Sequence, residues 1–305
     1  MPAVTTPFDE RDEVDLPRFG AHARWLVENG CSTLILFGSV GEGGTLAETE
    51  KRDMLRTLRE MPNLRAQVVT SVGALATRDA VRLAREFATL GSQGLMILPP
   101  YAYHGDPREV RAHFSAILGA TELPCMIYNN PIAYGTDLVP EEILDLATEH
   151  TNLAAVKESS GDVRRITSLR ALLGRRLELV VGIDDLLLEG IGAGATAWVG
   201  GLANALPRES VELLIHALPS KDGRGAELYR WLLPLLRLDS DAKFVQLIKA
   251  VVSLVGWGPA RLRLPRLAIE GNELERVRAT LERVLRDWPA NVPASTPIPT
   301  AVPKN

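Results

Sequence analysis

The sequence predicts an α/β protein in which eight consecutive βα units form a (β/α)8 TIM barrel with a C-terminal helical extension. Short apolar runs recur at intervals of roughly 20 to 35 residues, and an amphipathic helical pattern follows most of them. Polar or small residues stand at nearly every strand end, as expected where strand ends build a barrel mouth. An open doubly wound sheet is the alternative, but no Gly-x-Gly-x-x-Gly turn follows the first strand.

Eight segments are predicted to be strands because each is a short apolar run bounded by turn residues. In chain order they are residues 2–7, 32–39, 66–73, 94–100, 125–130, 153–159, 177–183 and 196–201. Helices are predicted where apolar residues recur at helical spacing. Clear examples are residues 16–30, 77–91, 107–120 and 139–150. Several of these stretches end in glycine, which commonly follows a helix.

The chain changes character near residue 225. Three helical patterns follow one another with no strand between them, at residues 226–239, 241–256 and 273–288. Residues 289–305 are rich in proline and have little apolar surface to bury, so we expect them to be disordered. The predicted organisation is a barrel over residues 1–224, a helical bundle over residues 225–288 and this tail.

Composition favours a globular protein that binds a small molecule. Of the 305 residues, 46% are hydrophobic and 24% are charged, and the net charge is −4. No long basic run favours nucleic acid or an anionic membrane surface as a partner. No run of about 18 apolar residues is present, and the N-terminus does not resemble a signal peptide. We therefore expect a cytoplasmic protein.

Cysteine and histidine usage indicates neither a disulfide framework nor a metal site. Cys31 and Cys125 are far apart in the sequence and are expected to be buried thiols. The five histidines do not cluster at the spacing of metal ligands. We therefore expect no bound metal ion.

Lys157 ends an apolar run, Leu153 to Val156, that is predicted to be a buried strand. Most lysines at such a place extend toward water. In a barrel, however, the carboxyl ends of the strands meet on the face where the chemistry is built. A lysine partly removed from water there can attack a carbonyl, and Tyr128, at the end of another strand, can move the proton. The pattern predicts Schiff-base chemistry.

The loop GSVGEGGTL, residues 38–46, follows the second predicted strand. Its glycines let backbone N–H groups approach an anion, and an α-keto carboxylate would fit there, so the turn that contains Ser39, Val40 and Gly41 is a candidate substrate site. A plain tight loop explains the glycines equally well. Glu42 is expected to orient the loop by hydrogen bonding. Three further residues are predicted to reach the same face from the last two strands: Asp184, Val199 and Gly200.

Four motifs, in this order and spacing, resemble the dihydrodipicolinate synthase and N-acetylneuraminate lyase superfamily. They are GSVGEGGTL (38–46), YNNP (128–131), KESSGD (157–162) and GATAWVGGLANALP (194–207). The resemblance implies a class I aldolase-type barrel, a homo-oligomer that is often a tetramer, and no cofactor. It also implies that Lys157 forms a Schiff base with an α-keto acid and that Tyr128 relays a proton. Ser39 and the Val40 N–H would hold the substrate carboxylate.

The sequence departs from the dihydrodipicolinate synthase pattern at three places. Val40 stands where those synthases usually have a second hydroxyl residue, so a proton relay through this position is lost. Ala133 stands where they have an arginine that binds the carboxylate of the second substrate. Tyr101 is followed by Ala102 in place of a second tyrosine, and Tyr103 is displaced by one residue. These departures argue against lysine biosynthesis.

Longer stretches, such as YNNPIAYGTDL and KESSGDVRRIT, are similar to the 1-pyrroline-4-hydroxy-2-carboxylate deaminases of hydroxyproline breakdown. In that reaction Lys157 would attack C2 of the cyclic imine and open the ring. The Schiff base would acidify C3, so that the C4 hydroxyl leaves and hydrolysis releases ammonia and 2,5-dioxopentanoate. The substrate carries one carboxylate, which suits a site without the arginine. This deaminase activity is the function that we predict from the sequence.

Three alternatives stay open. The first is a 4-hydroxy-tetrahydrodipicolinate (dihydrodipicolinate) synthase. The second is a dehydratase or aldolase of a 2-keto-3-deoxy sugar acid, for which Ala102 and Ala133 leave room and Tyr134 and Asp184 supply hydrogen bonds. The third is a non-catalytic barrel that binds a keto acid; the intact lysine and tyrosine argue against it.

Overall fold

The computed structural model describes residues 1–218, 223–289 and 292–298. The chain divides into two compact units. Unit 1 comprises Met1–Ala66 and Gly200–Asn305, and unit 2 comprises Gln67–Val199.

Unit 2 contains six parallel strands that pair in chain order, each with the next. They are β2 (Gln67–Val72), β3 (Gly94–Ile97), β4 (Cys125–Asn129), β5 (Leu153–Glu158), β6 (Glu178–Val181) and β7 (Ala197–Trp198). Every residue of β3 and β4 is buried, as is typical of parallel strands covered on both faces. The predicted α/β class is confirmed.

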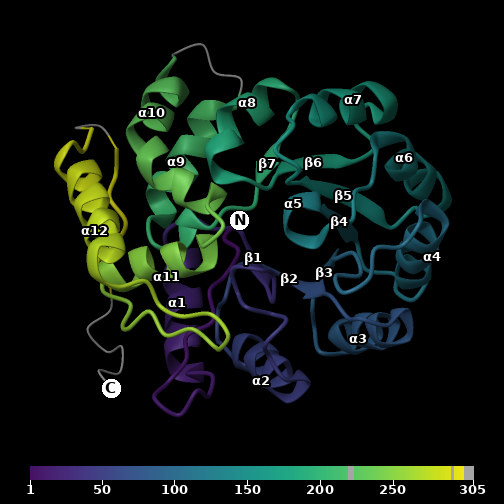
Figure 1. Cartoon of the computed structure of the whole chain (residues 1–305), viewed down its shortest axis with the longest axis horizontal. Helices are drawn as coiled ribbons and strands as arrows, with labels where there is room; N and C mark the ends of the chain where they lie inside the picture. Colours follow the sequence, from purple (N-terminus) through teal and green to yellow (C-terminus); the bar gives the residue numbers. More distant parts are fainter. Residues whose placement is uncertain (219–222, 290–291, 299–305) are drawn as a thin grey trace. The chain divides into compact units, whose positions relative to one another are not determined.

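Helices connect the strands of unit 2, because parallel neighbours need a crossover connection. They are α3 (Thr77–Thr89), α4 (Pro107–Leu118), α5 (Pro131–Tyr134), α6 (Pro140–Glu149), α7 (Arg164–Leu173), the 3₁₀ turn η1 (Asp184–Leu186) and α8 (Leu187–Gly192). Figure 1 shows α3, α4, α6 and α7 following one another along one side of the strands. In α3 the buried residues Ala80, Leu83, Ala84 and Phe87 recur at helical spacing, which is why this helix lies against the sheet.

Unit 1 contains β1 (Thr33–Leu36) and the three helices that were predicted near the C-terminus. Its other elements are α1 (Leu16–Glu28), α2 (Glu48–Arg59), η2 (Leu202–Asn204), α9 (Pro207–Ala217), α10 (Arg224–Leu236), η3 (Arg237–Ser240), α11 (Phe244–Leu254) and α12 (Gly271–Arg286). The predicted helices at 226–239, 241–256 and 273–288 correspond to α10, α11 and α12. The domain boundary at residue 225 stays a prediction.

The first predicted strand, residues 2–7, is wrong in extent. Only Pro2 and Ala3 form β-bridges, to Gly200 and Ile35 respectively. At the far end of the predicted strand, Pro7 has no N–H to donate to a ladder. Beyond Ala3 the chain also uses its polar groups elsewhere, since the Thr5 N–H donates to Asn204 Oδ1 at 3.0 Å. The segment nevertheless lies between β1 and Gly200 within unit 1.

The expectation of disorder for residues 289–305 falls partly on residues 290–291 and 299–305, which lie outside the described residues. Within the described part of this tail, the Thr296 N–H donates to Asn29 Oδ1 at 2.7 Å, and the Ser295 hydroxyl donates to Glu209 Oε2 at 2.6 Å. Residues 295 and 296 are therefore bonded to the ends of α1 and α9.

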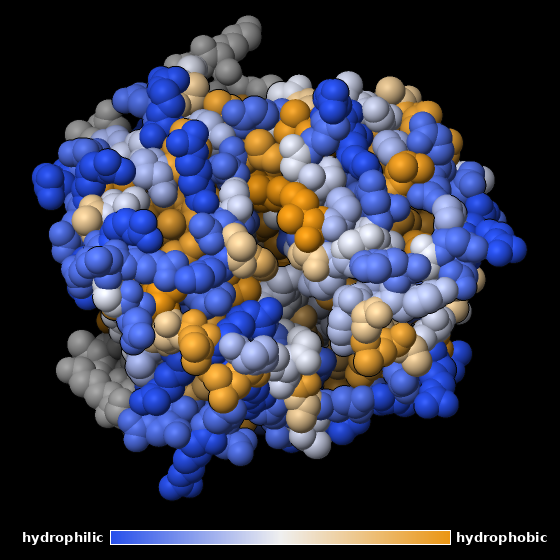
Figure 2. Space-filling model, in the orientation of Figure 1, coloured by the Kyte–Doolittle hydropathy of each residue, from blue (hydrophilic) through white to orange (hydrophobic). Residues whose placement is uncertain are grey.

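The visible surface in Figure 2 is mostly hydrophilic, with smaller apolar patches. Among the described residues, no helix combines the length and the apolar character needed to cross a bilayer.

Candidate active site

Lys157 and Tyr128 lie side by side at the carboxyl ends of β5 and β4. The parallel register pairs Tyr128 with Lys157 directly, so both side chains stand on the same face of the sheet. Lys157 Nζ lies 3.9 Å from the centroid of the Tyr128 ring. The two residues are 5% and 3% exposed, respectively. Among the described residues, no carboxylate forms an ion pair with Lys157. The amine therefore lies in a largely dry site against an aromatic face.

The Tyr128 hydroxyl is held by the residue two positions later. Asn130 Nδ2 donates to Tyr128 Oη at 2.9 Å, while Asn130 Oδ1 accepts from the Ala133 N–H at 3.0 Å and so caps α5. Because Oη is the acceptor in this bond, its own proton remains available for transfer. Asn130 thus orients the group that was predicted to relay a proton.

The opposite face of the same strands carries a separate polar network. Asn129 and Glu158 are the next register pair, and Asn129 Nδ2 donates to Glu158 Oε2 at 3.0 Å. Burial raises the pKa of the Glu158 carboxyl above its ordinary value. Arg165 Nη1 donates to Asp137 Oδ1 at 2.8 Å, and Asn129 Nδ2 also approaches that oxygen at 3.3 Å. This network ties β4, β5 and α7 together behind the lysine.

Gly182, which follows β6, leaves the space that the Lys157 side chain occupies. A Cβ atom placed on Gly182 would lie 2.9 Å from both Cγ and Cε of Lys157 and 1.9 Å from Ser159 Oγ. The Ser159 hydroxyl is buried and has no hydrogen-bond partner among the described residues. A buried hydroxyl without a partner is costly, so its position beside the lysine makes it available to a bound substrate.

Asp184 and Val199 lie in unit 2 with the lysine, but each makes a structural bond. Asp184 is fully buried, and its Oδ1 accepts from Trp198 Nε1 at 2.9 Å. The Val199 N–H donates to the Val181 carbonyl at 3.0 Å. Their predicted contacts with a substrate stay predictions.

The other four predicted site residues, Ser39, Val40, Gly41 and Gly200, belong to unit 1. Both backbone polar groups of Gly200 bond to the N-terminal segment. Its N–H donates to the Met1 carbonyl and its carbonyl accepts from the Ala3 N–H, both at 3.0 Å. Ser39, Val40 and Gly41 lie together in the loop after β1. Among the described residues, no group accepts a hydrogen bond from the N–H of Val40 or of Gly41. These two donors are available to an anion.

The shape of this loop depends on unusual backbone. Phe37 and Glu42 adopt φ values of 62° and 53°, which side-chain-bearing residues rarely adopt. A Cβ atom on Gly43 would lie 1.8 Å from the Phe37 carbonyl oxygen, so only glycine allows this close approach. Strained backbone of this kind concentrates at functional sites.

Glu42 is held by a buried ion pair with α11. Lys249 Nζ donates to Glu42 Oε1 at 2.6 Å, and the side chains are 5% and 0% exposed, respectively. The Arg263 N–H donates to Glu42 Oε2 at 3.1 Å. Burial lowers the pKa of the Lys249 amine below its ordinary value, although Glu42 opposes this shift. These contacts agree with the predicted orienting role of Glu42.

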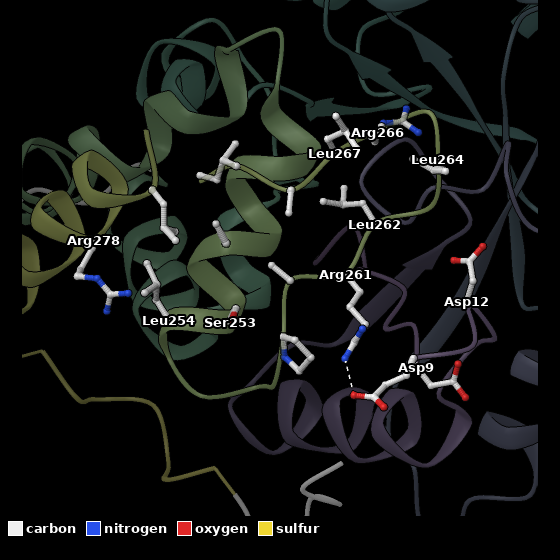
Figure 3. A pocket seen from close by; sticks show the side chains of 17 residues that line it. Asp9, Asp12, Ser253, Leu254, Arg261, Leu262, Leu264, Arg266, Leu267 and Arg278 are labelled. Atoms are coloured by element: carbon white, nitrogen blue, oxygen red, sulfur yellow. Dashed lines mark hydrogen bonds and ion pairs between the residues drawn. The ribbon is translucent and has the colours of Figure 1, made fainter. Parts of the chain in front are cut away.

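A cavity of about 660 Å³ lies within unit 1, lined by the segment 259–269, parts of α11 and α12, and the acidic turn near the N-terminus (Figure 3). Arg261, on its wall, forms an ion pair with Glu10 at 2.9 Å. None of the eight predicted site residues lines it. This cavity is therefore separate from the residues of the predicted site.

Four residues of the site were not predicted from the sequence: Asn130, Ser159, Gly182 and Lys249. Asn130 could have been found as the N-cap residue before Pro131, and Gly182 as a glycine directly after a strand. Lys249 stands alone among apolar residues in VQLIKAVVSLV, which is a signal for a buried and paired charge. Ser159 carried no sequence signal of its own.

Comparison with known proteins gives a consistent result. The family model described as "Dihydrodipicolinate synthetase family" matches residues 1–284. The chain is 28% identical to the 4-hydroxy-tetrahydrodipicolinate synthase of Methanocaldococcus jannaschii, over 94% of this chain and 96% of that protein. It is 33% identical to the same-named protein of a Synechococcus species, over 88% and 89% of the two chains.

Among solved structures, dihydrodipicolinate synthase from Aquifex aeolicus matches with a TM-score of 0.88 and 26% identity, over 96% of this chain and 98% of that one. The similarity covers nearly the whole chain in both sequence and structure. The chain therefore belongs to the dihydrodipicolinate synthetase family and is a class I lyase of that family.

Proposed function

We propose that this enzyme forms a Schiff base between Lys157 and the keto group of an α-keto acid. The observation that carries the proposal is the buried amine of Lys157, 3.9 Å from the Tyr128 ring centroid and without a carboxylate partner among the described residues. A buried amine that lies beside a phenol and is not engaged by a carboxylate among the described residues is placed to attack the carbonyl carbon of a bound keto acid.

In the proposed reaction Lys157 Nζ attacks the carbonyl carbon, and a C–N bond forms as the oxygen leaves as water. The product is an iminium, which acidifies the adjacent carbon. Loss of a proton from that carbon gives an enamine that can attack an aldehyde. Tyr128 Oη moves protons in these steps, and Asn130 keeps the hydroxyl in place. Water finally hydrolyses the iminium and frees Lys157.

The loop after β1 is proposed to hold the substrate carboxylate. This assignment is supported by the unpaired N–H groups of Val40 and Gly41 among the described residues, and by the left-handed backbone at Phe37 and Glu42. Ser39 adds a hydroxyl at the same turn. Hydrogen bonds from N–H groups to a carboxylate are charge-assisted and hold it in one orientation.

The first candidate reaction is the condensation of pyruvate with aspartate semialdehyde, because the relatives compared above carry the name 4-hydroxy-tetrahydrodipicolinate synthase. The deaminase that we predicted from the sequence finds no support among these relatives. It therefore takes second place.

The second candidate is the deaminase of 4-hydroxy-1-pyrroline-2-carboxylate. It is favoured by Ala133 and Val40, which stand where the synthase pattern has an arginine and a second hydroxyl. An aldehyde substrate with its own carboxylate would lack that cationic partner, whereas the cyclic imine carries a single carboxylate.

One preparation distinguishes the candidates. It is assayed for condensation of pyruvate with aspartate semialdehyde and for ammonia release from the cyclic imine, and borohydride trapping with pyruvate is followed by mass spectrometry. Condensation together with trapping supports the first candidate, the synthase reaction. Ammonia release without condensation would instead favour the second candidate, the deaminase reaction. Failure of wild type to be trapped, or trapping of the Lys157→Ala variant, overturns the Schiff-base proposal.

The closed (β/α)8 barrel is also part of this proposal. It is supported by the consecutive parallel pairing of β2 to β7, and by the bonds of the N-terminal segment to β1 and to Gly200 within unit 1. A homo-oligomeric state, dimer or tetramer, and a cytoplasmic location remain predictions.

A further inference from the structure

Lys249 lies on α11, and its amine is bonded to two segments that come from the first part of the chain. Nζ donates to Glu42 Oε1 at 2.6 Å and to the Thr6 carbonyl at 2.8 Å. It also lies 4.5 Å from the centroid of the Phe8 ring. The amine therefore joins α11, the N-terminal segment and the loop after β1 within unit 1.

Glu42 is the residue through which the Lys249 amine is connected to the backbone of the loop. Its N–H donates to the Ser39 carbonyl at 3.1 Å, and its carbonyl accepts from the Thr45 N–H at 2.8 Å. The residue adopts a left-handed backbone conformation that costs free energy unless surrounding contacts stabilise it. The buried ion pair supplies such a contact, because neither side chain can exchange its partner for water.

The N-terminal segment fixes the same loop from a second direction. The Thr6 hydroxyl donates to the Gly41 carbonyl at 2.7 Å. Because Lys249 binds the carbonyl of Thr6 and the carboxylate of Glu42, one amine holds both anchors of the turn from Ser39 to Glu42. The N–H groups of Val40 and Gly41, for which the described residues offer no acceptor, lie between these anchors.

We propose that Lys249 is a positioning residue that sets the affinity for the substrate carboxylate through Glu42. This inference rests on the proposed function, since it assumes that the loop after β1 binds the carboxylate of an α-keto acid. It assigns α11 a role in substrate binding even though Lys249 itself touches no reacting atom. Loss of the pair should raise the substrate concentration that half-saturates the enzyme and leave the reactivity of Lys157 unchanged.

The test compares variants by borohydride trapping over a range of pyruvate concentrations. Lys249→Met removes the amine but leaves Glu42 buried and unpaired, which can prevent folding. The double variant Glu42→Gln/Lys249→Met removes both charges and is expected to fold, because replacing a buried ion pair by neutral groups of similar size is commonly tolerated. In the double variant, half-saturation should require about 10- to 100-fold more pyruvate, the change that one or two lost hydrogen bonds to a charged group produce. Complete trapping should still occur at saturation.

Lys243→Met is the matched control. Lys243 adjoins the start of α11 and pairs with Glu273 at 2.8 Å, but its side chain is 53% exposed, so its loss should leave the half-saturating concentration unchanged. A folded double variant with the half-saturation of wild type would overturn the role of Lys249. An equal rise in the half-saturating pyruvate concentration in the Lys243→Met variant would also overturn the role of Lys249, because the effect would then not be specific to the buried pair. If wild type itself is not trapped, the proposed function fails, which is a different outcome from either of these.

Discussion

Two lysines of this protein are equally buried and have opposite surroundings. Lys157 and Lys249 are each 5% exposed. Each amine lies over an aromatic ring, at 3.9 Å from the Tyr128 centroid and 4.5 Å from the Phe8 centroid, respectively. Lys249 has a carboxylate at 2.6 Å, whereas Lys157 has none among the described residues.

On the proposed function, this difference means that burial alone does not make a lysine reactive. Glu42 opposes the burial that lowers the pKa of Lys249 and engages its amine in an ion pair, so this amine binds and positions. A buried amine beside a phenol, with no carboxylate bound to it among the described residues, is left accessible to a substrate carbonyl. Removing each lysine should therefore affect different properties of the protein.

The largest effects, on turnover and on the free energy of unfolding, are expected when Lys157→Met and Lys249→Met are compared directly. Lys157→Met should abolish turnover and trapping, because the nucleophile is gone, and should leave the free energy of unfolding unchanged or higher. Lys249→Met should lower the free energy of unfolding by about 3–5 kcal/mol, because it strands the buried Glu42 carboxylate. Both quantities come from denaturant titration and a turnover assay on the same samples. Equal decreases in the free energy of unfolding in the two variants would contradict the distinction between Lys157, which has no carboxylate partner among the described residues, and the ion-paired Lys249.

The next effect tests the aromatic neighbour of Lys157, the proposed nucleophile. Tyr128→Phe keeps the ring beneath Nζ and removes only the hydroxyl that Asn130 holds. A loss of about 10²- to 10⁴-fold in turnover is expected for a group that transfers protons. Steady-state kinetics measure it, with the trapped mass as a check that the Schiff base still forms. Normal turnover would assign Tyr128 to packing alone.

A smaller loss should follow from filling the space beside Lys157. In the Gly182→Ala variant the new Cβ would lie 2.9 Å from Lys157 Cε, so the lysine must move. A shift of this kind costs about 10²-fold in turnover. Gly192→Ala is the control, because a Cβ there has no atom within 4 Å. Equal kinetics for the two variants would show that the lysine tolerates displacement.

Sequence reasoning predicted those parts of the protein that depend on local pattern. Seven of the eight predicted strands are present because each apolar run has its own turn signals, and parallel register then brings Tyr128 and Lys157 together. The first predicted strand extends too far because the Thr5 N–H donates to Asn204 Oδ1, 199 residues away in the chain, and the apolar pattern contains no information about that bond. The pairing of Lys249 with Glu42 spans 207 residues of chain, and spacing in the sequence contains no information about such a contact. That the Ser159 hydroxyl has no partner within the described part of the chain is likewise a property of its surroundings alone.

A pH measurement tests whether Glu158, the sequence neighbour of Lys157, is a hidden counter-ion. Burial raises the pKa of Glu158, so the folded protein binds a proton more readily than the unfolded chain. The resulting stabilisation is present below the unfolded pKa of 4.5 and is lost as pH rises through the folded value. The free energy of unfolding of wild type minus that of Glu158→Gln should therefore fall from pH 4 to pH 7. A rise over this range would indicate an ion pair with Lys157 and end the contrast between the two lysines.

The smallest effect is expected from changing Phe8, the aromatic residue beside Lys249. Phe8→Leu removes the ring face from Lys249 and also from Arg263, whose guanidinium carbon lies 4.5 Å from the same centroid. A double-mutant cycle separates the two cations: Phe8→Leu is made in wild type and in the Glu42→Gln/Lys249→Met background. The difference between the two losses of unfolding free energy is the coupling of Phe8 to the ion pair, and we expect about 1 kcal/mol. Turnover at saturating substrate should stay unchanged in Phe8→Leu, because this ring contacts Lys249, the proposed positioning residue, and not Lys157, the proposed nucleophile. A coupling near zero would mean that the carboxylate alone holds Lys249, and that only around Lys157 does the aromatic face matter.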